Sequence, residues 1–404
     1  MAENSDWLSV DAAISALLRR SVPVLQQETL ALSSSFQRIL AQDIRATRAV
    51  PPMACSAMDG YALHVNDYQP GKSLLVSQRI AAGQVPEKLS PGTCARIFTG
   101  APVPEGANAV VMQEQVEVDA VGVKFSVMPM EGMNIRAAGH DVARGQQVLQ
   151  AGMRLGPLQV GLLASLGQAQ VQVWERPRAV LFSTGNELLE VHESWRPGCI
   201  YNSNRPMLSA LLQSWGFEVL DLGIVPDALE VTRQRWREAL ELQPHVIISS
   251  GGVSVGDEDH VQKLLHLEGQ LQFWKVAIRP GKPLCVADYG GVCVLGLPGN
   301  PMGAWVTLCA VARPFLLKMT GQISKPLHGV SGIAGFERQT GLRQEYWPAC
   351  EREGRWYMAE NFSSGSIWPA AACEGWVVLP PHTVVRPGDA IGVVRTAEWL
   401  VMGE

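Results

Sequence analysis

The sequence predicts an α/β multidomain protein whose largest domain is a doubly wound, mostly parallel sheet. Strand-like and helix-like segments alternate from Arg178 to about residue 320, a pattern typical of parallel sheets covered by helices on both faces. Short alternating β runs with Gly and Pro turns fill residues 65–127 and recur after Lys325, which indicates separate β domains. At 404 residues the chain is also too long for one core.

We therefore divide the chain into four parts. Residues 1–50 with 141–176 are expected to form a helical linking region, residues 51–140 a β-rich domain, residues 177–325 the doubly wound α/β domain, and residues 326–404 a C-terminal domain resembling a small β-barrel. In the linking region, Leu8–Leu18 has amphipathic helical spacing, and Phe36–Ile44 is interpreted as a second short helical piece. Leu155–Gly167 is a third helix, with Pro157 early, where its missing N–H costs nothing.

In the α/β domain, the strand–helix alternation can be followed element by element. Strands are expected from Arg178, Phe217, Val246 and Val292, each a run of apolar residues followed by a turn. Helices are expected between and after them, in 202–216, 229–242, 260–269 and 302–319. The loops STGNE, VPD, SGGVSVGDED and LPGNP then all lie beyond the carboxyl ends of the strands. Ligands bind at this edge in doubly wound sheets.

The stretch from Pro244 to Pro301 organises the domain. Gly251 and Gly252 follow the short buried strand Val246–Ile248 and allow a turn with positive φ or a close approach of the backbone. A helix follows directly, so its free N–H groups and dipole favour an anion at the turn. The carboxyls in the same turn would repel a phosphate unless a divalent cation lay between them. A phosphate-plus-metal site and a simple βα turn with an acidic helix cap both explain this pattern.

Bulk properties exclude several classes of function. A net charge of -5 and the lack of a basic run argue against nucleic-acid binding. No apolar run approaches the length of a membrane span, and the N-terminus lacks the apolar segment of a secretion signal. Eight scattered cysteines without a C-x-x-C motif argue against a zinc site and fit a reducing compartment, so a cytoplasmic protein is expected.

Acidic and basic residues gather at the predicted ligand edge. The acids are Glu187, Asp227, Asp257 and Asp259, and the bases are Lys275, Arg279 and Lys282. Acids that hold Mg²⁺ beside bases that neutralise oxygens suit phosphoryl or nucleotidyl chemistry. A lattice of surface ion pairs would show the same composition. Asp59 and Asp141 occupy similar Gly-marked loops of another domain.

These loops together resemble one family, the molybdopterin molybdenumtransferases, which also supply the C-terminal part of gephyrin. The matching segments are SAMDGYA at Ser56, RIFTGAPVPEGANAVVMQE at Arg96, NIRAAGHD at Asn134, STGNEL at Ser183, YNSNRPML at Tyr201, SGGVSVGDED at Ser250, PGKP at Pro280 and GLPGNP at Gly296. The resemblance runs from the N-terminal helix to roughly Gly321 and is weaker in the tail. So many motifs in one order make it specific.

The resemblance implies that the protein inserts molybdate into adenylylated molybdopterin and releases AMP, with Mg²⁺ as cofactor. It also implies an elongated homodimer, with each active site shared between the α/β domain of one subunit and the β-rich domain of the other. Molybdopterin adenylyltransferase, acceptor molybdoenzymes or their chaperones are the implied protein partners. The alternatives are the related molybdopterin adenylyltransferase activity and a non-catalytic molybdopterin-binding scaffold. Insertion of tungstate instead of molybdate stays open.

The resemblance assigns site residues motif by motif. The catalytic set is Asp59, Asp141, Glu187, Asp227, Asp259 and Lys275, and the metal ligands are drawn from Asp257, Asp259, Glu187 and Asp227. Substrate binding is assigned to Thr99, Arg136, Ser183, Thr184, Gly185, Asn204, Gly251, Gly252, Ser254, Arg279, Lys282, Pro298, Asn300 and Pro301. Five positions depart from the usual family pattern, namely Asn186, Arg279, Gly303, Trp368 and Pro369.

Overall fold

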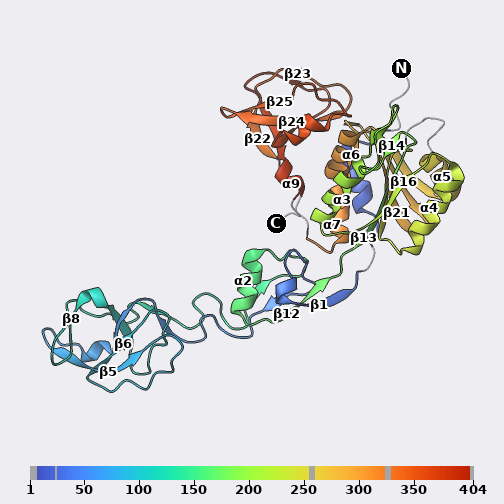
Figure 1. Ribbon diagram of the computed structural model, residues 1–404. Coiled ribbons are helices and arrows are strands. Elements are labelled where there is room, and N and C mark those ends of the chain that lie inside the picture. Colours follow the sequence, from blue (N-terminus) through green and yellow to red (C-terminus); the bar gives the residue numbers. More distant parts are fainter. Residues whose placement is uncertain (1–6, 23–24, 254–259, 324–328, 401–404) are drawn as a thin grey trace.

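The computed structural model describes residues 7–22, 25–253, 260–323 and 329–400. The molecule is elongated, with a β-rich lobe at one end, the linking region in the middle, and the α/β and C-terminal domains together at the other end (Figure 1). This arrangement agrees with the predicted multidomain α/β fold. The elements below are given with their bounds in each of these four parts.

The α/β domain contains a six-stranded sheet in the order β16-β13-β17-β21-β20-β18. Its first four strands are parallel, while β20 and β18 are antiparallel additions at one edge. Helices cover both faces, as predicted (Figure 1). The elements are α1 (Val10–Leu18), β13 (Arg178–Thr184), β14 (Leu188–Leu189), β15 (Ile200–Tyr201), α3 (Asn204–Ser214), β16 (Glu218–Val225), α4 (Leu229–Glu241), β17 (Val246–Ser250), α5 (His260–Glu268), β18 (Gln270–Lys275), β19 (Ile278–Arg279), β20 (Pro283–Tyr289), β21 (Val292–Leu297), α6 (Pro301–Thr307), η4 (Leu308–Ala312) and α7 (Arg313–Met319).

The central strands are buried on both faces, because helices pack on each side of the sheet. All five residues of β17 are buried, and alternate residues belong to different cores. Val246 and Ile248 lie in the core beneath α3, α6 and α7, whereas Ile247 lies in the core beneath α4 and α5. A strand buried on both faces reads as a continuous apolar run, which is why β17 was predictable.

The segment 301–319 is one continuous helical rod, α6–η4–α7, with a π-helical turn in its middle. By length and composition alone it is apolar enough to cross a membrane, contrary to the expectation that no apolar run approaches that length, and it is the one such helix in the described part of the chain. However, 78% of its apolar window is buried inside the structure. It is therefore the core helix of the α/β domain, packed against α1 and the sheet.

The linking region is less helical than predicted. It consists of the elements β1 (Gln27–Ala31), η1 (Leu32–Ser34), β2 (Ile44–Arg45), β11 (Gln147–Leu149), α2 (Pro157–Ser165) and β12 (Gln170–Trp174), with β1 paired to β12 and β2 to β11. The predicted helix at Phe36–Ile44 is wrong, because Leu40 there is extended and bridges Val173 in β12. The predicted helix α1 exists, capped by the Ser9 side chain, but it packs in the α/β core rather than in the linking region.

The β-rich lobe is built on a six-stranded sheet in the order β7-β4-β6-β5-β9-β8. Its elements are β3 (Cys55–Ser56), β4 (Gly60–Leu63), η2 (Val65–Asp67), β5 (Ser73–Ile80), β6 (Thr93–Ile97), β7 (Ala109–Met112), η3 (Gln113–Gln115), β8 (Val116–Val118), β9 (Val123–Phe125) and β10 (Ile135–Arg136). Two small apolar cores, around Ile80 and around Leu63, lie on the two faces of this sheet. The predicted β-rich character is confirmed.

The C-terminal domain is a small, strongly curved sheet in the order β19-β24-β26-β28-β22, with β25 beside β24. A bridge between Ala334 and Trp356 brings the β22 end next to β25, so the sheet closes almost into a barrel. Its elements are β22 (Val330–Ile333), β23 (Arg338–Gln339), β24 (Gln344–Arg352), β25 (Arg355–Met358), α8 (Ile367–Ala371), β26 (Gly375–Leu379), β27 (Val384–Val385), β28 (Ala390–Arg395) and α9 (Thr396–Leu400). β19 comes from the α/β domain and pairs with β24, which joins the two domains directly.

Candidate active site

The predicted loops converge at the carboxyl edge of the sheet. Because β13, β17 and β21 are parallel neighbours, the residues that follow them meet there. A cavity of about 260 Å³ at this edge is lined by Thr184, Gly185, Glu187, Asp227, Gly251, Gly252, Val253, Pro283, Pro298 and Gly299. Nine of these residues end or follow β13, β16, β17 and β21, and Pro283 begins β20, so the convergence expected from the strand order is confirmed.

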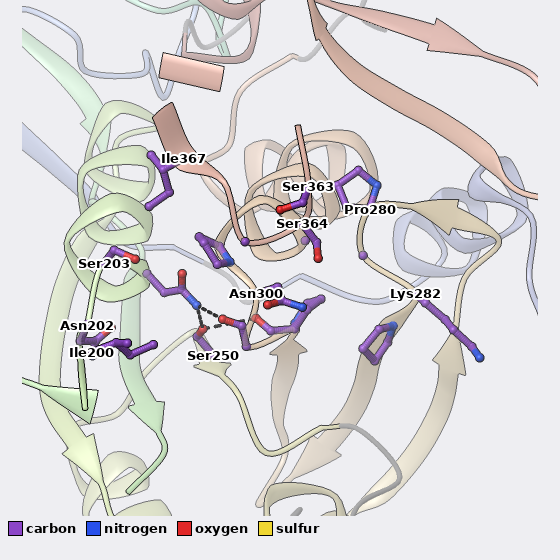
Figure 2. A pocket seen from close by; sticks show the side chains of 18 of the residues that line it. Ile200, Asn202, Ser203, Ser250, Pro280, Lys282, Asn300, Ser363, Ser364 and Ile367 are labelled. Atoms are coloured by element: carbon purple, nitrogen blue, oxygen red, sulfur yellow. Dashed lines mark hydrogen bonds between the residues drawn. The ribbon is translucent and has the colours of Figure 1, made fainter. Parts of the chain in front are cut away.

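A larger cavity of about 960 Å³ adjoins the first and shares five lining residues with it, Thr184, Glu187, Pro283, Pro298 and Gly299. Figure 2 shows its walls facing one another, with Asn202 on one side, Lys282 on the other, and Ser363 and Ser364 of the C-terminal domain near Asn300. The floor is the loop Pro298–Pro301 at the start of α6. This cavity therefore lies between the α/β domain and the C-terminal domain.

The Gly251–Gly252 turn packs tightly around the hydroxyl group of Thr184. Both glycines have positive φ, +94° and +68°, and a Cβ on either would lie 2.9 Å from Thr184 Oγ1. That hydroxyl is buried and has no hydrogen-bond partner within the described part of the chain. A buried hydroxyl normally finds a partner. The turn thus presents an unused donor at the place where an anion was predicted.

Two asparagines on the opposite wall also have unused polar atoms. Asn204 donates through Nδ2 to Ser250 Oγ at 2.6 Å and to the Gly299 carbonyl at 2.7 Å, which ties three loops together. Its Oδ1, and Nδ2 of Asn202, are buried without a partner among the described residues. Both residues line the larger cavity. A ligand in the cavity would satisfy these groups, since unpaired buried polar atoms cost about 1–3 kcal/mol each.

Acidic groups occupy the smaller cavity. Asp227 Oδ2 accepts from the Asn186 N–H at 3.0 Å, and Asn186 Oδ1 accepts from the Asp227 N–H at 3.1 Å. This reciprocal pair fixes the loop after β13 to the loop after β16. The Glu187 carboxylate folds back over Gly185, where a Cβ would lie 2.5 Å from Glu187 Oε2. Gly185 is therefore required for Glu187 to adopt this position.

Basic groups lie on the other side of the larger cavity. Arg279, Lys282 and Arg343 all line it, and all three also line a neighbouring cavity of about 430 Å³. The Lys282 ammonium lies 4.6 Å from the centre of the Trp7 ring, a cation–π contact that directs it towards the neighbouring cavity, which Trp7 also lines. Arg279 Nη1 pairs with Glu345 at 3.3 Å. Cations at one end and carboxylates at the other give the site a charge gradient.

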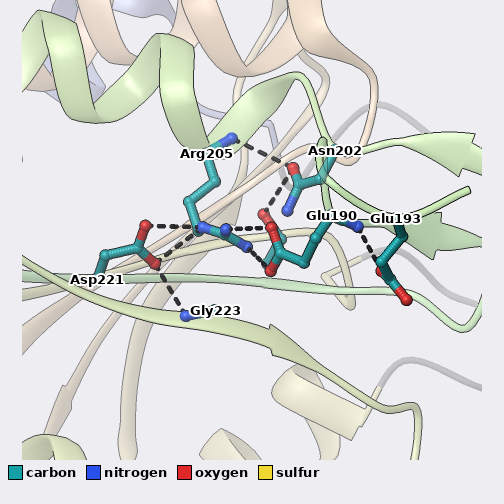
Figure 3. Close-up of polar contacts among 7 residues, drawn as sticks. Glu190, Glu193, Asn202, Arg205, Asp221 and Gly223 are labelled. Atoms are coloured by element: carbon teal, nitrogen blue, oxygen red, sulfur yellow. Dashed lines mark hydrogen bonds and ion pairs between the residues drawn. The ribbon is translucent and has the colours of Figure 1, made fainter.

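A partly buried ion-pair network supports the acidic wall from behind (Figure 3). The Arg205 guanidinium contacts Glu190 through Nη1 at 2.8 Å and Nη2 at 2.5 Å, and Asp221 through Nε at 2.8 Å. The hydrogen bond from Arg205 is the main reason why the pKa of Glu190 is lowered. Glu190 lies three residues after Glu187, so the network anchors the loop that carries the acid.

The structure brings together most of the residues that the sequence singled out. Those lining one of the two cavities are Thr184, Gly185, Glu187, Asn204, Asp227, Gly251, Gly252, Arg279, Lys282, Pro298, Asn300 and Pro301. Ser183 lies just behind, where its hydroxyl contacts Asn202 Oδ1 at 3.3 Å. Ser254, Asp257 and Asp259 lie outside the described residues, so their predicted roles are not tested.

Five predicted residues lie elsewhere. Lys275 ends β18, where its ammonium stacks on Trp274, and it lines neither cavity. The other four, Asp59, Thr99, Arg136 and Asp141, lie in or next to the distal β-rich lobe (Figure 1). There Asp59 Oδ1 accepts from the Thr99 N–H and hydroxyl at 2.7 and 2.8 Å, and these bonds lower the pKa of Asp59.

The sequence analysis missed several residues that line the larger cavity. They are Asn202 and Ser250, whose motifs were noted without a role, and Arg343, Trp347, Phe362, Ser363, Ser364 and Gly365 from the C-terminal domain. The stretch NFSSGS, with Ser and Gly after an apolar strand, is typical of a loop. Nothing in its composition indicates that it faces the α/β domain.

No group of three or more potential metal ligands is found among the described residues. Glu187 and Asp227 nevertheless line one small cavity together. Their donors are carboxylate oxygens, which are the ligands that Mg²⁺ prefers. The donor chemistry therefore fits a hard divalent cation at this position.

Two family models match the chain. The "MoeA N-terminal region (domain I and II)" matches residues 8–167, and the "Probable molybdopterin binding domain" matches residues 180–318. A solved structure titled as the molybdopterin biosynthesis MoeA protein of Pyrococcus horikoshii superposes with a TM-score of 0.84 at 25% identity, over 96% of this chain and 100% of that one. The four-part architecture is thus shared over nearly the whole length.

Curated relatives agree with these matches. A molybdopterin molybdenumtransferase of Haemophilus influenzae is 40% identical over 80% of both chains. One of Synechococcus elongatus is 32% identical over 92% of this chain and 95% of its own length, and one of a Nostoc species is 37% identical over 73% of this chain and 70% of its own. With the ligand loops assembled as described, this chain belongs to the molybdopterin molybdenumtransferase family of enzymes.

Proposed function

We propose that this protein inserts molybdate into adenylylated molybdopterin and releases AMP, with Mg²⁺ bound near the acidic wall. The observation that carries this proposal is the cavity of about 960 Å³ whose buried Thr184, Asn202 and Asn204 each have an unused polar atom. Its volume suits a ligand of nucleotide size. Family membership supports a molybdopterin substrate, and the charge gradient supports a ligand with anionic groups.

In this proposal each wall of the cavity makes a different interaction with the ligand. The Gly251–Gly252 turn and the Thr184 hydroxyl would donate to phosphate oxygens. Lys282 would neutralise charge on the same ligand, because it borders the cavity opposite the asparagine wall. Asn202 and Asn204 would orient the polar edge of the ligand through their unused Nδ2 and Oδ1 atoms. All these groups belong to well-packed elements, so they are held in place before the substrate arrives.

Glu187 and Asp227 would hold Mg²⁺, joined by the predicted ligands Asp257 and Asp259. When bound, the cation would offset the negative charge of the phosphoanhydride. The chain's own contribution is to hold the two carboxylates in one cavity. The Asn186–Asp227 pair does this for one acid, and the fold of Glu187 over Gly185 does it for the other. Asn186 departs from the family pattern. In this proposal it holds Asp227 in place through the two hydrogen bonds that join their loops.

We also propose a homodimer in which the β-rich lobe of one subunit completes the site of the other. Asp59 precedes β4, Thr99 follows β6, Arg136 ends β10 and Asp141 comes shortly after it; the β-rich lobe that these elements form lies at the opposite end of the molecule from the α/β domain (Figure 1). A second subunit would give these four residues a substrate to act on. In the same proposal the protein is cytoplasmic. Its further partners are molybdopterin adenylyltransferase, as substrate donor, and acceptor molybdoenzymes or their chaperones.

The function is tested by following AMP release from adenylylated molybdopterin with Mg²⁺, with and without molybdate. We expect release that depends on molybdate, and a decrease of about 100-fold or more in Glu187→Gln, because the carboxylate charge is removed from the site. Glu241→Gln at the exposed end of α4 is the matched control and should behave as wild type. Tight binding of the substrate without AMP release would contradict the proposal and favour a non-catalytic scaffold.

A further inference from the structure

Two cysteines of the C-terminal domain lie in direct contact. The Sγ atoms of Cys350 and Cys373 are 2.9 Å apart, although the residues are 23 positions apart in the sequence. Both side chains are half-buried. Of the other six cysteines, Cys94, Cys285, Cys293 and Cys309 are buried, and burial raises their pKa values. The Cys350–Cys373 pair therefore combines accessibility with proximity.

The surrounding sheet holds the pair in place. Cys350 belongs to β24, and Cys373 lies in the turn between α8 and β26. The two strands are paired at Ala349 and Gly375, directly beside the cysteines. A disulfide has an S–S bond of about 2.05 Å, so closure requires the sulfurs to approach by roughly 1 Å. Side-chain rotation can supply such a movement while the strand register is kept.

We propose that Cys350 and Cys373 form a reversible intramolecular disulfide in exchange with a small disulfide such as oxidised glutathione. In the first step, the Cys350 thiolate attacks one sulfur of oxidised glutathione. An S–S bond breaks, one glutathione thiolate leaves, and a mixed disulfide forms on Cys350. In the second step, the Cys373 sulfur attacks Cys350 Sγ and displaces the second glutathione. Two protein thiols are oxidised, one glutathione disulfide is reduced, and both protons end on glutathione.

The order of the two steps follows from the environment of Cys373. Burial, and next its hydrogen bond with Cys350, raise the pKa of Cys373 to about 12. Its thiolate is therefore scarce at neutral pH, and attack on a dissolved disulfide would be slow. As the second nucleophile it already lies in contact with its target. The hydrogen bond from Cys350 is lost once that thiol has been modified, which removes one cause of the high pKa.

The disulfide would close a loop that reaches the larger cavity. The closed segment, residues 351–372, contains β25, α8 and the intervening stretch with Phe362, Ser363, Ser364 and Gly365, all of which line the cavity. That stretch contacts α6 through the Met302 N–H and the Ser364 carbonyl, 2.9 Å apart. Cross-linking its base restricts the conformations it can adopt. Oxidation would thus stiffen the wall that the C-terminal domain contributes.

The test uses the full chain equilibrated in glutathione buffers of increasing oxidised fraction, then unfolded in denaturant, alkylated and mapped by mass spectrometry. We expect two of the eight thiols to become protected from alkylation together. One pair of peptides should be linked through Cys350 and Cys373, and dithiothreitol should release the link. The oxidised protein should have a Tm higher by roughly 5 °C. Hydrogen exchange of residues 359–366 should be slower in the oxidised form.

Three variants separate the proposed disulfide from general oxidation. Cys350→Ser and Cys373→Ser should each abolish the linked peptide, the rise in Tm and the slower exchange. Cys199→Ser removes another half-buried thiol and should keep all three effects. The proposal is overturned if all eight thiols of the wild type stay open to alkylation in oxidised glutathione. It is also overturned if the linked peptides join other cysteines. These readouts do not depend on the proposed enzymatic activity.

Discussion

Arg205 and Glu190 form a two-point ion pair behind the candidate active site, with Nη1–Oε1 at 2.8 Å and Nη2–Oε2 at 2.5 Å (Figure 3). The Arg205 backbone N–H also contacts Asn202 Oδ1 at 3.3 Å, and the Asn202 N–H contacts the Leu189 carbonyl at 2.9 Å. The start of α3 is thus fixed to the loop that carries Glu187. Arg205 itself lines neither cavity, so we infer that any effect it has on catalysis acts through the position of this loop.

Replacement of Arg205 by Lys should weaken both stability and catalysis. Lys keeps the charge but cannot contact Glu190 at two points and Asp221 at a third. We expect the free energy of unfolding to fall by roughly 1–3 kcal/mol and kcat for AMP release to fall by about 10-fold, with a smaller change in KM. Denaturant titration and steady-state kinetics measure these effects.

Arg233→Lys is the matched control. Arg233 also bridges two carboxylates, Glu230 and Glu268, but on the outer surface of α4 and α5. Arg233→Lys should change the free energy of unfolding much less than Arg205→Lys does, because surface ion pairs are screened by solvent, and it should leave kcat unchanged. Wild-type kinetics for Arg205→Lys would show that the Arg205 network has no part in positioning Glu187.

Glu345 should make the junction between the α/β and C-terminal domains sensitive to acid. Its side chain is 4% exposed and accepts from Arg338 at 2.7 Å and from Trp347 Nε1 at 2.8 Å, and it pairs with Arg279. Burial alone would raise the pKa of Glu345, but the bonds from Trp347 and Arg338 and the two positive charges lower it below its usual 4.5. The ionised Glu345 carboxylate therefore contributes its full stabilisation of the folded state above about pH 5. This contribution is lost as the pH falls through the lowered pKa.

Glu345→Gln should lower the free energy of unfolding by roughly 2–3 kcal/mol at pH 7, because two arginines lose their counter-charge. The difference from wild type should shrink as the pH falls towards 3, which denaturant titrations across this pH range can measure. Glu351→Gln on the same strand is the control, because it removes the exposed partner of Arg395. It should lower the free energy of unfolding by less than about 1 kcal/mol. An equal loss for Glu345→Gln at pH 7 and pH 3 would contradict the linkage.

Gly251→Ala should damage the anion turn. Gly251 has φ +94°, and a Cβ would lie 2.6 Å from the Thr184 carbonyl oxygen and 2.9 Å from Thr184 Oγ1. We expect a loss of roughly 2–4 kcal/mol in unfolding free energy and weaker substrate binding, measured by calorimetry. Gly291→Ala is the control, since its φ is +81° but its Cβ would meet nothing within 4 Å. The Gly291→Ala variant should lose only about 1 kcal/mol in unfolding free energy and should bind substrate as the wild type does.

The sequence predicted the α/β domain well because local patterns and tertiary packing agree there. Strands such as β17 begin with a run of buried apolar residues, Val246–Ile248, and the parallel order then places the loops at one edge. Phe36–Ile44 failed because its apolar residues, Ile39, Leu40 and Ile44, are buried through extended pairing with distant strands rather than on a helix face. Tertiary contacts decided the local conformation in this segment.

The part of the site that was missed comes from the C-terminal domain. Phe362 and Ser363 reach the cavity because β19 pairs with β24 and brings the two domains together. That pairing joins Ile278 to Gln344 across 66 residues, with no turn motif to predict it. Lys275 was expected at the same edge, but its ammonium stacks on Trp274 and it lines neither cavity, so its assigned role stays a prediction. Proximity in sequence did not settle the direction of the side chain.

The proposed shared site predicts complementation between two inactive variants. Asp59→Ala removes the partner of Thr99 in the distal lobe, and Glu187→Ala removes a carboxylate of the cavity. If each site needs Glu187 from one subunit and Asp59 from the other, both homodimers are inactive. A mixed dimer then contains one site with both acids intact. After subunit exchange, half of the dimers are mixed, so about a quarter of wild-type AMP release should return.

The matched control mixes Asp59→Ala with Asp141→Ala. Both residues belong to the same side of the proposed shared site, so every site of a mixed dimer lacks one of them and activity should not return. Activity that stays absent in the Asp59→Ala and Glu187→Ala mixture, although native mass spectrometry shows mixed dimers, would mean that the distal lobe does not serve the partner's cavity. A monomeric mass for the wild type would overturn the shared site at once. In that case the exposed Asp59–Thr99 pair would have to reach the cavity of its own chain by a large movement of the β-rich lobe.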